Sequence, residues 1–353
     1  MRARLLHPGW PLLHSAAART LALLLLGLLC ASCTRERPPG LLRVGYYPNV
    51  THAQALIGME TGMFQAQMPD GVRVEGKIFT SGPALIEALY SGSIDIGYIG
   101  PNPALNGFIH SEGRALRIIA GASSGGAAFV VRPDSGIRTA EDLRGKTVAT
   151  PQLGNTQDVA LRSFLSEHGL APDSRGGDVR VVPMGNPDIF SMFKRGEIDG
   201  AWVAEPWGAR LELDAGGRVF LDERHLWPGG RFVTAHVIAR TRLVEEEPEL
   251  VKAFLRGHVL ATRRYHADPQ WAQAMMLQHI GELSKQKLSP AVIERAMSRV
   301  EVTWDPVPAS LKEAAEAAQL LGFLHTDDIE GIYDLGPLNE VLREQGLARK
   351  RNP

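Results

Sequence analysis

The chain has 353 residues, a formal net charge of −1, 44% apolar residues and 22% charged residues. This length exceeds the size at which a single hydrophobic core usually splits into two, and the composition is that of a globular protein. The near-neutral charge argues against a nucleic-acid binder, which carries a basic surface. The only cysteines are Cys30 and Cys33. A disulfide scaffold or a cysteine zinc site in the body of the fold is therefore excluded.

Residues 1–32 are predicted to be a signal segment. Three arginines accompany a leucine-rich run at 21–29, which is shorter than the roughly 20 apolar residues of a bilayer span. The run leads into Cys30-Ala31-Ser32-Cys33, which resembles a lipobox, the processing site of bacterial lipoproteins. The resemblance implies that Cys33 carries lipid and anchors the protein to a membrane. The alternative is an ordinary signal peptide that is cleaved nearby without lipid.

Residues 33–40 are short of apolar side chains and contain prolines, so we expect a tether between the lipid and the folded part. Removal of residues 1–32 takes away three arginines and no acidic residue. The exported chain would therefore carry a net charge of −4 in place of −1.

Strand-like and helix-like stretches alternate behind the tether. The expected strands are 42–46, 72–79, 94–99, 116–122, 127–132, 147–150, 179–183, 200–203 and 234–240. The expected helices are 53–62, 83–91, 101–111, 156–168, 187–195, 205–215, 248–267, 271–280, 290–299 and 308–321. This alternation predicts an α/β fold whose mostly parallel sheets are flanked by helices, followed by a helical C-terminal region.

The sequence also repeats itself. Gly-x-Ile-Asp followed by a short apolar stretch occurs at 92–95 and again at 196–199, an offset of 104 positions. The same offset aligns Val44 with Val148, and each of these valines belongs to an expected strand that leads into a polar loop and a helix. We therefore predict two copies of one strand–loop–helix unit, at about 42–110 and 146–212.

Small and polar residues follow the expected strands. In open parallel sheets, ligands bind beyond the carboxyl ends of the strands. Helix N termini there expose unpaired N–H groups and a partial positive charge, which suits an anion. The predicted ligand-binding residues at these positions are Asn49, Thr51, His52, Asn102, Ser123, Ser124, Asn155, Thr156 and Glu205. The alternative for any one of the Ser, Thr and Asn residues is that it only caps its helix.

Two of these residues allow further interpretations. His52 can donate to an anion, although a single histidine near a helix start can also be incidental. Glu205 stands at an expected helix start, where its carboxylate could meet an amine or a ring nitrogen of a ligand. The alternative for Glu205 is compensation of the helix dipole in the first turn.

Several motifs together resemble a known family. They are Gly-Ser-Ile-Asp-Ile-Gly at 92–97, Glu-Asp-Leu-Arg-Gly-Lys-Thr-Val at 141–148 and Ala-Glu-Pro-Trp at 204–207. With the signal segment and the start at 44–55, they are similar to the substrate-binding proteins of nitrate/sulfonate/taurine-type ABC importers. The resemblance implies a two-lobed periplasmic-binding-protein fold of type II that closes on its ligand. The implied parts are lobe 1 at 41–131 and 234–300, lobe 2 at 132–233, and a C-terminal helical segment at 301–353.

The resemblance also implies a function. The protein would be the extracytoplasmic solute-binding component of an ABC importer, in the periplasm or at the cell surface, acting as a monomer. It would capture a small organic or inorganic anion of the sulfonate, taurine or nitrate class and deliver it to permease subunits in the membrane. The family does not fix the ligand, so a thiamine-related pyrimidine or another heterocycle stays an alternative. No cofactor, no metal and no nucleic-acid partner is expected.

An exported enzyme on the same fold is the alternative from another class. Residues 121–125 match Gly-x-Ser-x-Gly, but a nucleophile elbow lies between a strand and a helix, and a strand follows here. Lys146 and Thr147 resemble the end of a P-loop, but Ala140 stands where the first glycine is required. The eleven histidines form no His-x-His or His-x-x-x-His pair of the kind that binds metal.

Overall fold

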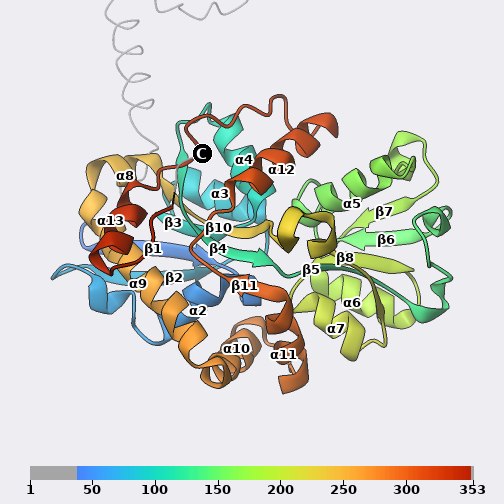
Figure 1. Ribbon diagram of the computed structural model, residues 1–353, viewed down its shortest axis with the longest axis horizontal. Coiled ribbons are helices and arrows are strands. Elements are labelled where there is room, and N and C mark those ends of the chain that lie inside the picture. The colour runs from blue at the N-terminus through green and yellow to red at the C-terminus, as the bar shows by residue number, and fades with distance from the viewer. Residues whose placement is uncertain (1–37, 351–353) are drawn as a thin grey trace, which may run out of the picture. The chain divides into compact units, whose positions relative to one another are not determined.

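The computed structural model describes residues 38–350, which build two β-sheets with helices packed on both faces of each sheet (Figure 1). Both sheets belong to one compact unit. The expected signal segment 1–32, Cys33 and most of the tether 33–40 lie outside the described residues. Within the described residues, no helix has the length and apolar character needed to cross a membrane.

The first sheet has the strand order β11-β4-β10-β3-β1-β2. Its strands are β1 (Leu41–Tyr46), β2 (Arg73–Ile78), β3 (Ile96–Ile99), β4 (Leu116–Gly125), β10 (Val233–Arg240) and β11 (Val300–Val302). Strand β1 runs parallel to β2 and β3, whereas β10 runs antiparallel to both β3 and β4. The returning strand β10 thus separates the parallel strands from β4.

The second sheet has the order β7-β6-β8-β5-β9. Its strands are β5 (Ala127–Val131), β6 (Thr147–Thr150), β7 (Arg180–Pro183), β8 (Gly200–Ala204) and β9 (Arg218–Asp222). Strand β6 is parallel to β7 and β8, and β5 is antiparallel to β8 and β9. Both sheets are therefore mixed: β10 in the first sheet and β5 in the second run antiparallel to their neighbours.

The chain leaves the first sheet at Gly125–Gly126, since β5 already pairs within the second sheet. The expected boundary between lobes 1 and 2 stood after residue 131, six residues later. The chain returns to the first sheet with β10, which begins at Val233. The C-terminal part expected as a helical segment also supplies the end of β11, which pairs with β4 in the first sheet.

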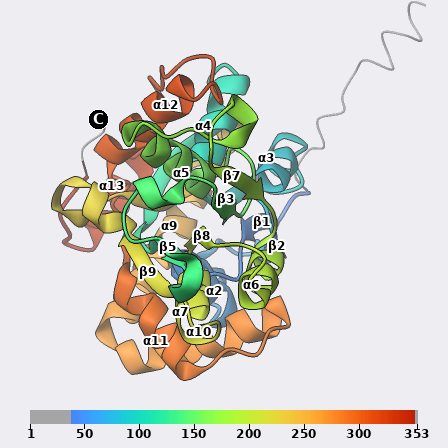
Figure 2. The same cartoon turned by 90° about the vertical axis from the view of Figure 1, so that its right-hand side faces the viewer.

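The helices form four packing layers around the two sheets. Their bounds are α2 (Ala53–Glu60), α3 (Gly82–Tyr90), α4 (Pro101–His110), α5 (Thr156–Glu167), α6 (Asn186–Arg195), α7 (Trp207–Leu213), α8 (Thr241–Glu246), α9 (Pro248–Ala267), α10 (Pro269–Ser284), α11 (Pro290–Arg299), α12 (Pro308–Leu320) and α13 (Gly336–Glu344). One face of the first sheet packs against α2, α9, α10, α11 and α13, and the other against α3, α4 and α12. Helix α5 covers one face of the second sheet and α6 with α7 the other, as Figure 2 shows.

The predicted repeat is confirmed by strand register. Val44 pairs with Ile96, and 104 positions later Val148 pairs with Gly200. The aspartate of each Gly-x-Ile-Asp motif holds the start of this strand pair. The Oδ2 atom of Asp95 accepts a 2.9 Å hydrogen bond from the N–H of Arg43, and Oδ2 of Asp199 accepts a 2.8 Å bond from the N–H of Thr147. In both copies the motif therefore stabilises the pairing of neighbouring strands.

Candidate functional site

A small cavity of about 100 Å³ lies beyond the carboxyl ends of the parallel strands of both sheets. We call it the strand-end cavity. It is lined by Tyr47, Asn49, Thr51, His52, Thr80, Ser81, Gly82, Gly100, Pro103, Pro151, Gln152, Asn155, Thr156, Gln157, Asn186, Ala204 and Thr234. Helices α3, α4, α5 and α6 begin around it, so the cavity lies at the partially positive ends of four helices.

The lining of the strand-end cavity contains no Lys, Arg, Asp or Glu among the described residues. Its polar groups are hydroxyls, amides and one imidazole. Uncharged donors at helix N termini can bind an anion through several hydrogen bonds without an opposite charge. The cavity therefore has the chemistry of an anion site that selects by size and geometry.

His52 enters this site as a neutral donor. Burial lowers the pKa of His52 from 6.5 to about 3, so the ring is uncharged at neutral pH. Its Nδ1 atom accepts a 3.2 Å hydrogen bond from the backbone N–H of Tyr47, and the two rings stack at 4.7 Å. Because Nδ1 accepts, the proton of the neutral ring resides on Nε2. That N–H group is left to donate to a ligand.

The hydroxyl of Tyr47 and the side-chain oxygen of Asn186 are buried in the wall of the cavity without a hydrogen-bond partner among the described residues. Burial raises the pKa of the Tyr47 phenol, so it stays protonated and able to donate. Buried polar groups normally find a partner, and one left alone beside a cavity points to a ligand. The sequence prediction did not include Tyr47, although its position directly after β1 is a signal of the kind used for Asn49.

Asn49 and Asn155 both cap a helical turn and line the cavity. The Oδ1 atom of Asn155 accepts a 2.9 Å bond from the N–H of Asp158, and Oδ1 of Asn49 accepts a 3.5 Å bond from the N–H of Thr51. Each cap uses the amide oxygen and leaves the amide nitrogen for other partners. The capping and binding interpretations are therefore compatible at both residues.

The two sheets come close to each other at the edge of this cavity. A Cβ atom built on Gly100, at the start of α4, would lie 2.7 Å from Oγ1 of Thr156, at the start of α5. Such a distance is too short for a real side chain, so only glycine permits this approach. Thr51, which the prediction also included, lies on the same cavity and is buried.

Four predicted residues, Asn102, Ser123, Ser124 and Glu205, do not line the strand-end cavity. Asn102 lines a larger cavity of about 350 Å³, which Thr156 also lines. Ser123 and Ser124 were expected in a loop, but β4 continues to Gly125 because β10 and β11 both pair with its end. Both serines are thus buried in a strand, and neither lines the strand-end cavity.

Glu205, which was predicted to bind the ligand, pairs with an arginine instead. Its carboxylate is fully buried and lines neither cavity. Oε1 accepts a 2.8 Å hydrogen bond from Nη1 of Arg299 in α11, and Oε2 accepts a 2.8 Å bond from the N–H of Ala209 in α7. Arg299 also bonds Glu212 at 2.5 Å. Arg299 thus occupies the position at the Glu205 carboxylate where a ligand amine was expected. Nothing in the sequence near Glu205 indicates this pairing.

No group of three or more His, Cys, Asp or Glu side chains suited to a metal ion is found within the described residues. The described part of the chain contains two mixed sheets, with a polar cavity beyond the ends of their parallel strands. These features define the two-lobed periplasmic-binding-protein fold, as the sequence resemblance implied.

The chain belongs to the NMT1-like family, whose model matches residues 35–279, more than half of the sequence. It is 31% identical over 199 residues to the taurine-binding periplasmic protein of Escherichia coli K12, a match that covers 56% of this chain and 59% of that protein. The chain thus matches less than two thirds of the length of this relative.

Two solved structures share the fold. The aliphatic sulphonate binding protein SsuA from Escherichia coli superimposes with a TM-score of 0.67 at 21% identity, covering 84% of this chain and 96% of that one. The nitrate-binding protein NrtA from Synechocystis PCC 6803 gives a TM-score of 0.70 at 16% identity, covering 86% and 89%.

Proposed function

We propose that this protein is the solute-binding component of an ABC importer and that it captures a small anion in the strand-end cavity. The observation that supports the proposal is the lining of that cavity, which is rich in uncharged donors and contributed by both sheets. A ligand that contacts both sheets favours the arrangement in which they lie close together. A permease can then distinguish the ligand-bound protein from the free protein.

The ligand class that fits best is a sulfonate. The taurine-binding relative and the sulfonate-binding structural neighbour carry such ligands in their names. A cavity of about 100 Å³ is small for an organic ring system but suited to a compact anionic group. In the heterocycle alternative, Glu205 would meet an amino group of the ligand, but its carboxylate is bonded to Arg299 and Ala209.

We further propose that the protein works outside the cytoplasm and is attached to a membrane by lipid on Cys33, beside its permease. The lipobox-like stretch before Cys33 supports this. Labelled palmitate fed to expressing bacteria is expected to enter the wild-type protein and not the Cys33→Ser variant. Equal labelling of both proteins would refute the lipid anchor without affecting the binding proposal.

Titration calorimetry with methanesulfonate, taurine and nitrate tests the binding function. We expect at least one of these anions to bind and Thr156→Val to weaken that binding about tenfold or more. A hydrogen bond to a charged group contributes roughly 1.5–3 kcal/mol, and about 1.4 kcal/mol is a factor of ten in Kd. The exposed Thr139, outside the cavity, supplies the matched control Thr139→Val, which should bind like the wild type. The absence of binding by all three anions would contradict the proposal.

A further inference from the structure

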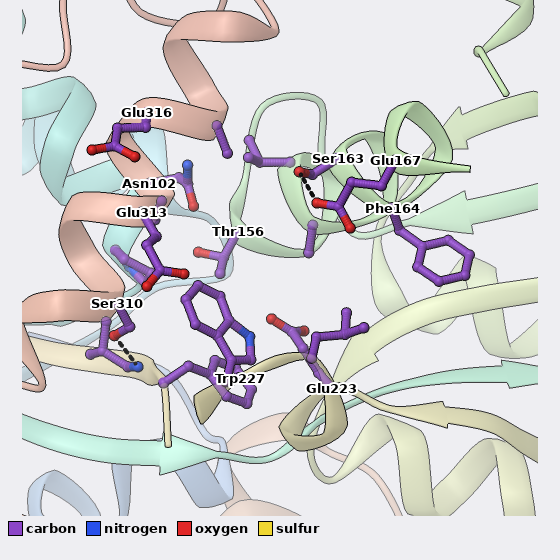
Figure 3. Close-up of a pocket in the computed structure, with 18 of the residues that line it drawn as sticks. Asn102, Thr156, Ser163, Phe164, Glu167, Glu223, Trp227, Ser310, Glu313 and Glu316 are labelled. Carbon is purple, nitrogen blue, oxygen red and sulfur yellow. Dashed lines mark hydrogen bonds between the residues drawn. The ribbon is translucent and has the colours of Figure 1, made fainter. Parts of the chain in front are cut away.

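The larger cavity, of about 350 Å³, differs from the strand-end cavity in its walls and its chemistry (Figure 3). Helices α4 and α12 line it from the side of the first sheet, and α5 with the turn at 223–227 lines it from the side of the second sheet. Among the described residues, the linings of the two cavities share only Thr156. The larger cavity is therefore a binding space of its own.

Four carboxylates surround the larger cavity, and no Lys, Arg or His of the described residues lines it. They belong to Glu167, Glu223, Glu313 and Glu316. Within the described part of the chain, only Glu316 has a cationic group within 4 Å, the Nζ atom of Lys312 at 3.9 Å. Several carboxylates around one cavity, without basic side chains in its wall, favour a cation there.

The arrangement of these carboxylates suits an organic cation better than a metal ion. Figure 3 shows Glu313 and Glu316 on one side of the cavity and Glu167 and Glu223 on the other. The described residues contain no group of three or more His, Cys, Asp or Glu side chains that could hold a metal ion. The volume lies within the roughly 300–1,000 Å³ of organic-ligand sites. A negative charge spread around a space of this size fits an extended, weakly hydrated cation.

An aromatic wall adds to this preference. The indole of Trp227 stacks on Phe232, with the ring centroids 5.4 Å apart and an angle of 14° between the planes. Figure 3 shows the Trp227 ring inside the cavity, with Glu313 to one side of it and Glu223 to the other. The face of a tryptophan attracts ammonium groups, and quaternary ammonium groups in particular, through the ring quadrupole.

A buried amide in the wall indicates a second group on the ligand. Asn102 lines the larger cavity and is only 4% exposed, and its Nδ2 atom has no hydrogen-bond partner within the described residues. Buried donors normally have an acceptor, so a donor left alone beside a cavity points to an acceptor on a ligand. A quaternary ammonium group cannot accept a hydrogen bond. The cation must therefore carry an oxygen atom as well.

We propose that the larger cavity is a second binding site, for a small organic cation that combines a quaternary ammonium group with a hydroxyl or carbonyl oxygen. The ammonium group lies against Trp227, between the carboxylates of Glu223 and Glu313. The oxygen atom accepts a hydrogen bond from Nδ2 of Asn102. This site is separate from the anion site of the proposed function and takes a ligand of opposite charge.

Titration calorimetry with choline and two close relatives tests this inference. In 3,3-dimethylbutan-1-ol a carbon atom replaces the charged nitrogen, and ethyltrimethylammonium lacks the hydroxyl group. We expect the wild-type protein to bind choline about tenfold more tightly than the neutral alcohol, a ratio that corresponds to ~1.4 kcal/mol. We expect choline to bind about threefold or more tightly than ethyltrimethylammonium, because one hydrogen bond is lost.

Two variants assign these preferences to the cavity. In Glu313→Gln/Glu316→Gln the ratio between choline and the neutral alcohol should fall towards one. In Asn102→Leu, which keeps the size of a side chain whose Nδ2 has no partner, the ratio between choline and ethyltrimethylammonium should fall towards one. The matched control is Glu294→Gln on α11, an exposed glutamate outside the cavity, which should bind all three compounds like the wild type.

The absence of choline binding, or equal affinities for choline and the neutral alcohol, would overturn the cation site. Ratios that both variants leave unchanged would do the same, since choline would then bind elsewhere. Choline should still bind in the presence of saturating methanesulfonate, and its complete exclusion would contradict a separate site. If methanesulfonate itself does not bind, the proposed function fails while the choline measurements still decide on the cation site.

Discussion

Burial changes the charge state of two side chains near the cavities in opposite directions. It lowers the pKa of His52 to about 3, and it raises the pKa of Glu223 from 4.5 to about 7. The imidazole is thus a neutral donor at every physiological pH, whereas the carboxyl of Glu223 takes up a proton close to neutrality. His52 in the strand-end cavity therefore keeps its protonation state over a pH range in which Glu223, in the wall of the larger cavity, changes its charge.

The raised pKa of Glu223 predicts a pH-dependent stability. Since the folded-state pKa lies above the unfolded value, the contribution of this group is fully present below about pH 4.5 and is lost as the pH rises through about 7. Glu223→Gln removes this dependence and keeps an acceptor for Trp202. Between about pH 5 and 8 we expect the variant to gain roughly 2–3 kcal/mol in unfolding free energy relative to the wild type.

Urea denaturation at several pH values measures this difference. The exposed residue Glu294 supplies the control, because Glu294→Gln should follow the wild type at every pH. A constant difference between Glu223→Gln and the wild type would show that the carboxyl titrates normally.

At the scale of elements, the two Gly-x-Ile-Asp motifs have the same backbone role in different surroundings. The carboxylate of Asp95 is 1% exposed and binds Nε and Nη2 of the buried Arg43 at 3.0 and 2.8 Å. That of Asp199 is 23% exposed and lies 3.7 Å from Arg132. Removing one partner of a buried ion pair leaves the other charge buried and uncompensated.

The two aspartates should therefore differ in their contribution to stability. We expect Asp95→Ala to lower the free energy of unfolding by about 3–5 kcal/mol, and Asp199→Ala by only about 1 kcal/mol. Chemical denaturation of both variants in the same buffer provides the comparison. Losses of similar size would mean that the backbone contact, which the two copies share, determines the effect.

The sequence predicted the fold best in the two copies of the repeated unit. The 104-residue offset predicted the repeated unit, which strand pairing at the same offset confirms. The prolines at 248, 290 and 308 marked helix starts that the structure also confirms. Strands β9 and β11 escaped prediction because each owes its extended form to pairing with β5 or β4, distant partners that no local pattern reveals.

For the site as well, local patterns were informative and distant contacts were not. Polar residues directly behind parallel strands, such as Asn49 and Thr156, lie on the strand-end cavity because strand ends converge there. Glu205 occupies an equivalent position, but its environment is set by Arg299, 94 residues further along the chain. Long-range charge pairing of this kind depends on the packing of α11 against α7, which has no signature in the sequence around Glu205.

At the scale of the whole molecule, Arg299 links the two sheets. It lies at the end of α11, which packs with the first sheet, and it bonds two carboxylates beside the second sheet, Glu205 and Glu212. Because Glu205 is fully buried, an unpaired carboxylate there would be strongly unfavourable. This ion pair is therefore expected to tie the position of α11 to that of the second sheet.

A double-mutant cycle tests this link. Arg299→Met should destabilise the protein by about 3–5 kcal/mol, and adding Glu205→Gln should recover part of the loss, with a coupling of about 1–3 kcal/mol. Thermal and chemical unfolding of the four proteins give the coupling free energy. Strictly additive effects would mean that the two side chains act independently.

In the proposed function, uncharged donors between the two sheets bind the anion. A crystal structure of the protein with methanesulfonate tests it most directly. We expect the sulfonate in the strand-end cavity, with its oxygens within about 3.2 Å of Tyr47 Oη, His52 Nε2 and Thr156 Oγ1. A sulfonate bound instead beside arginines such as Arg224 and Arg231, with the strand-end cavity filled only by water, would contradict the account.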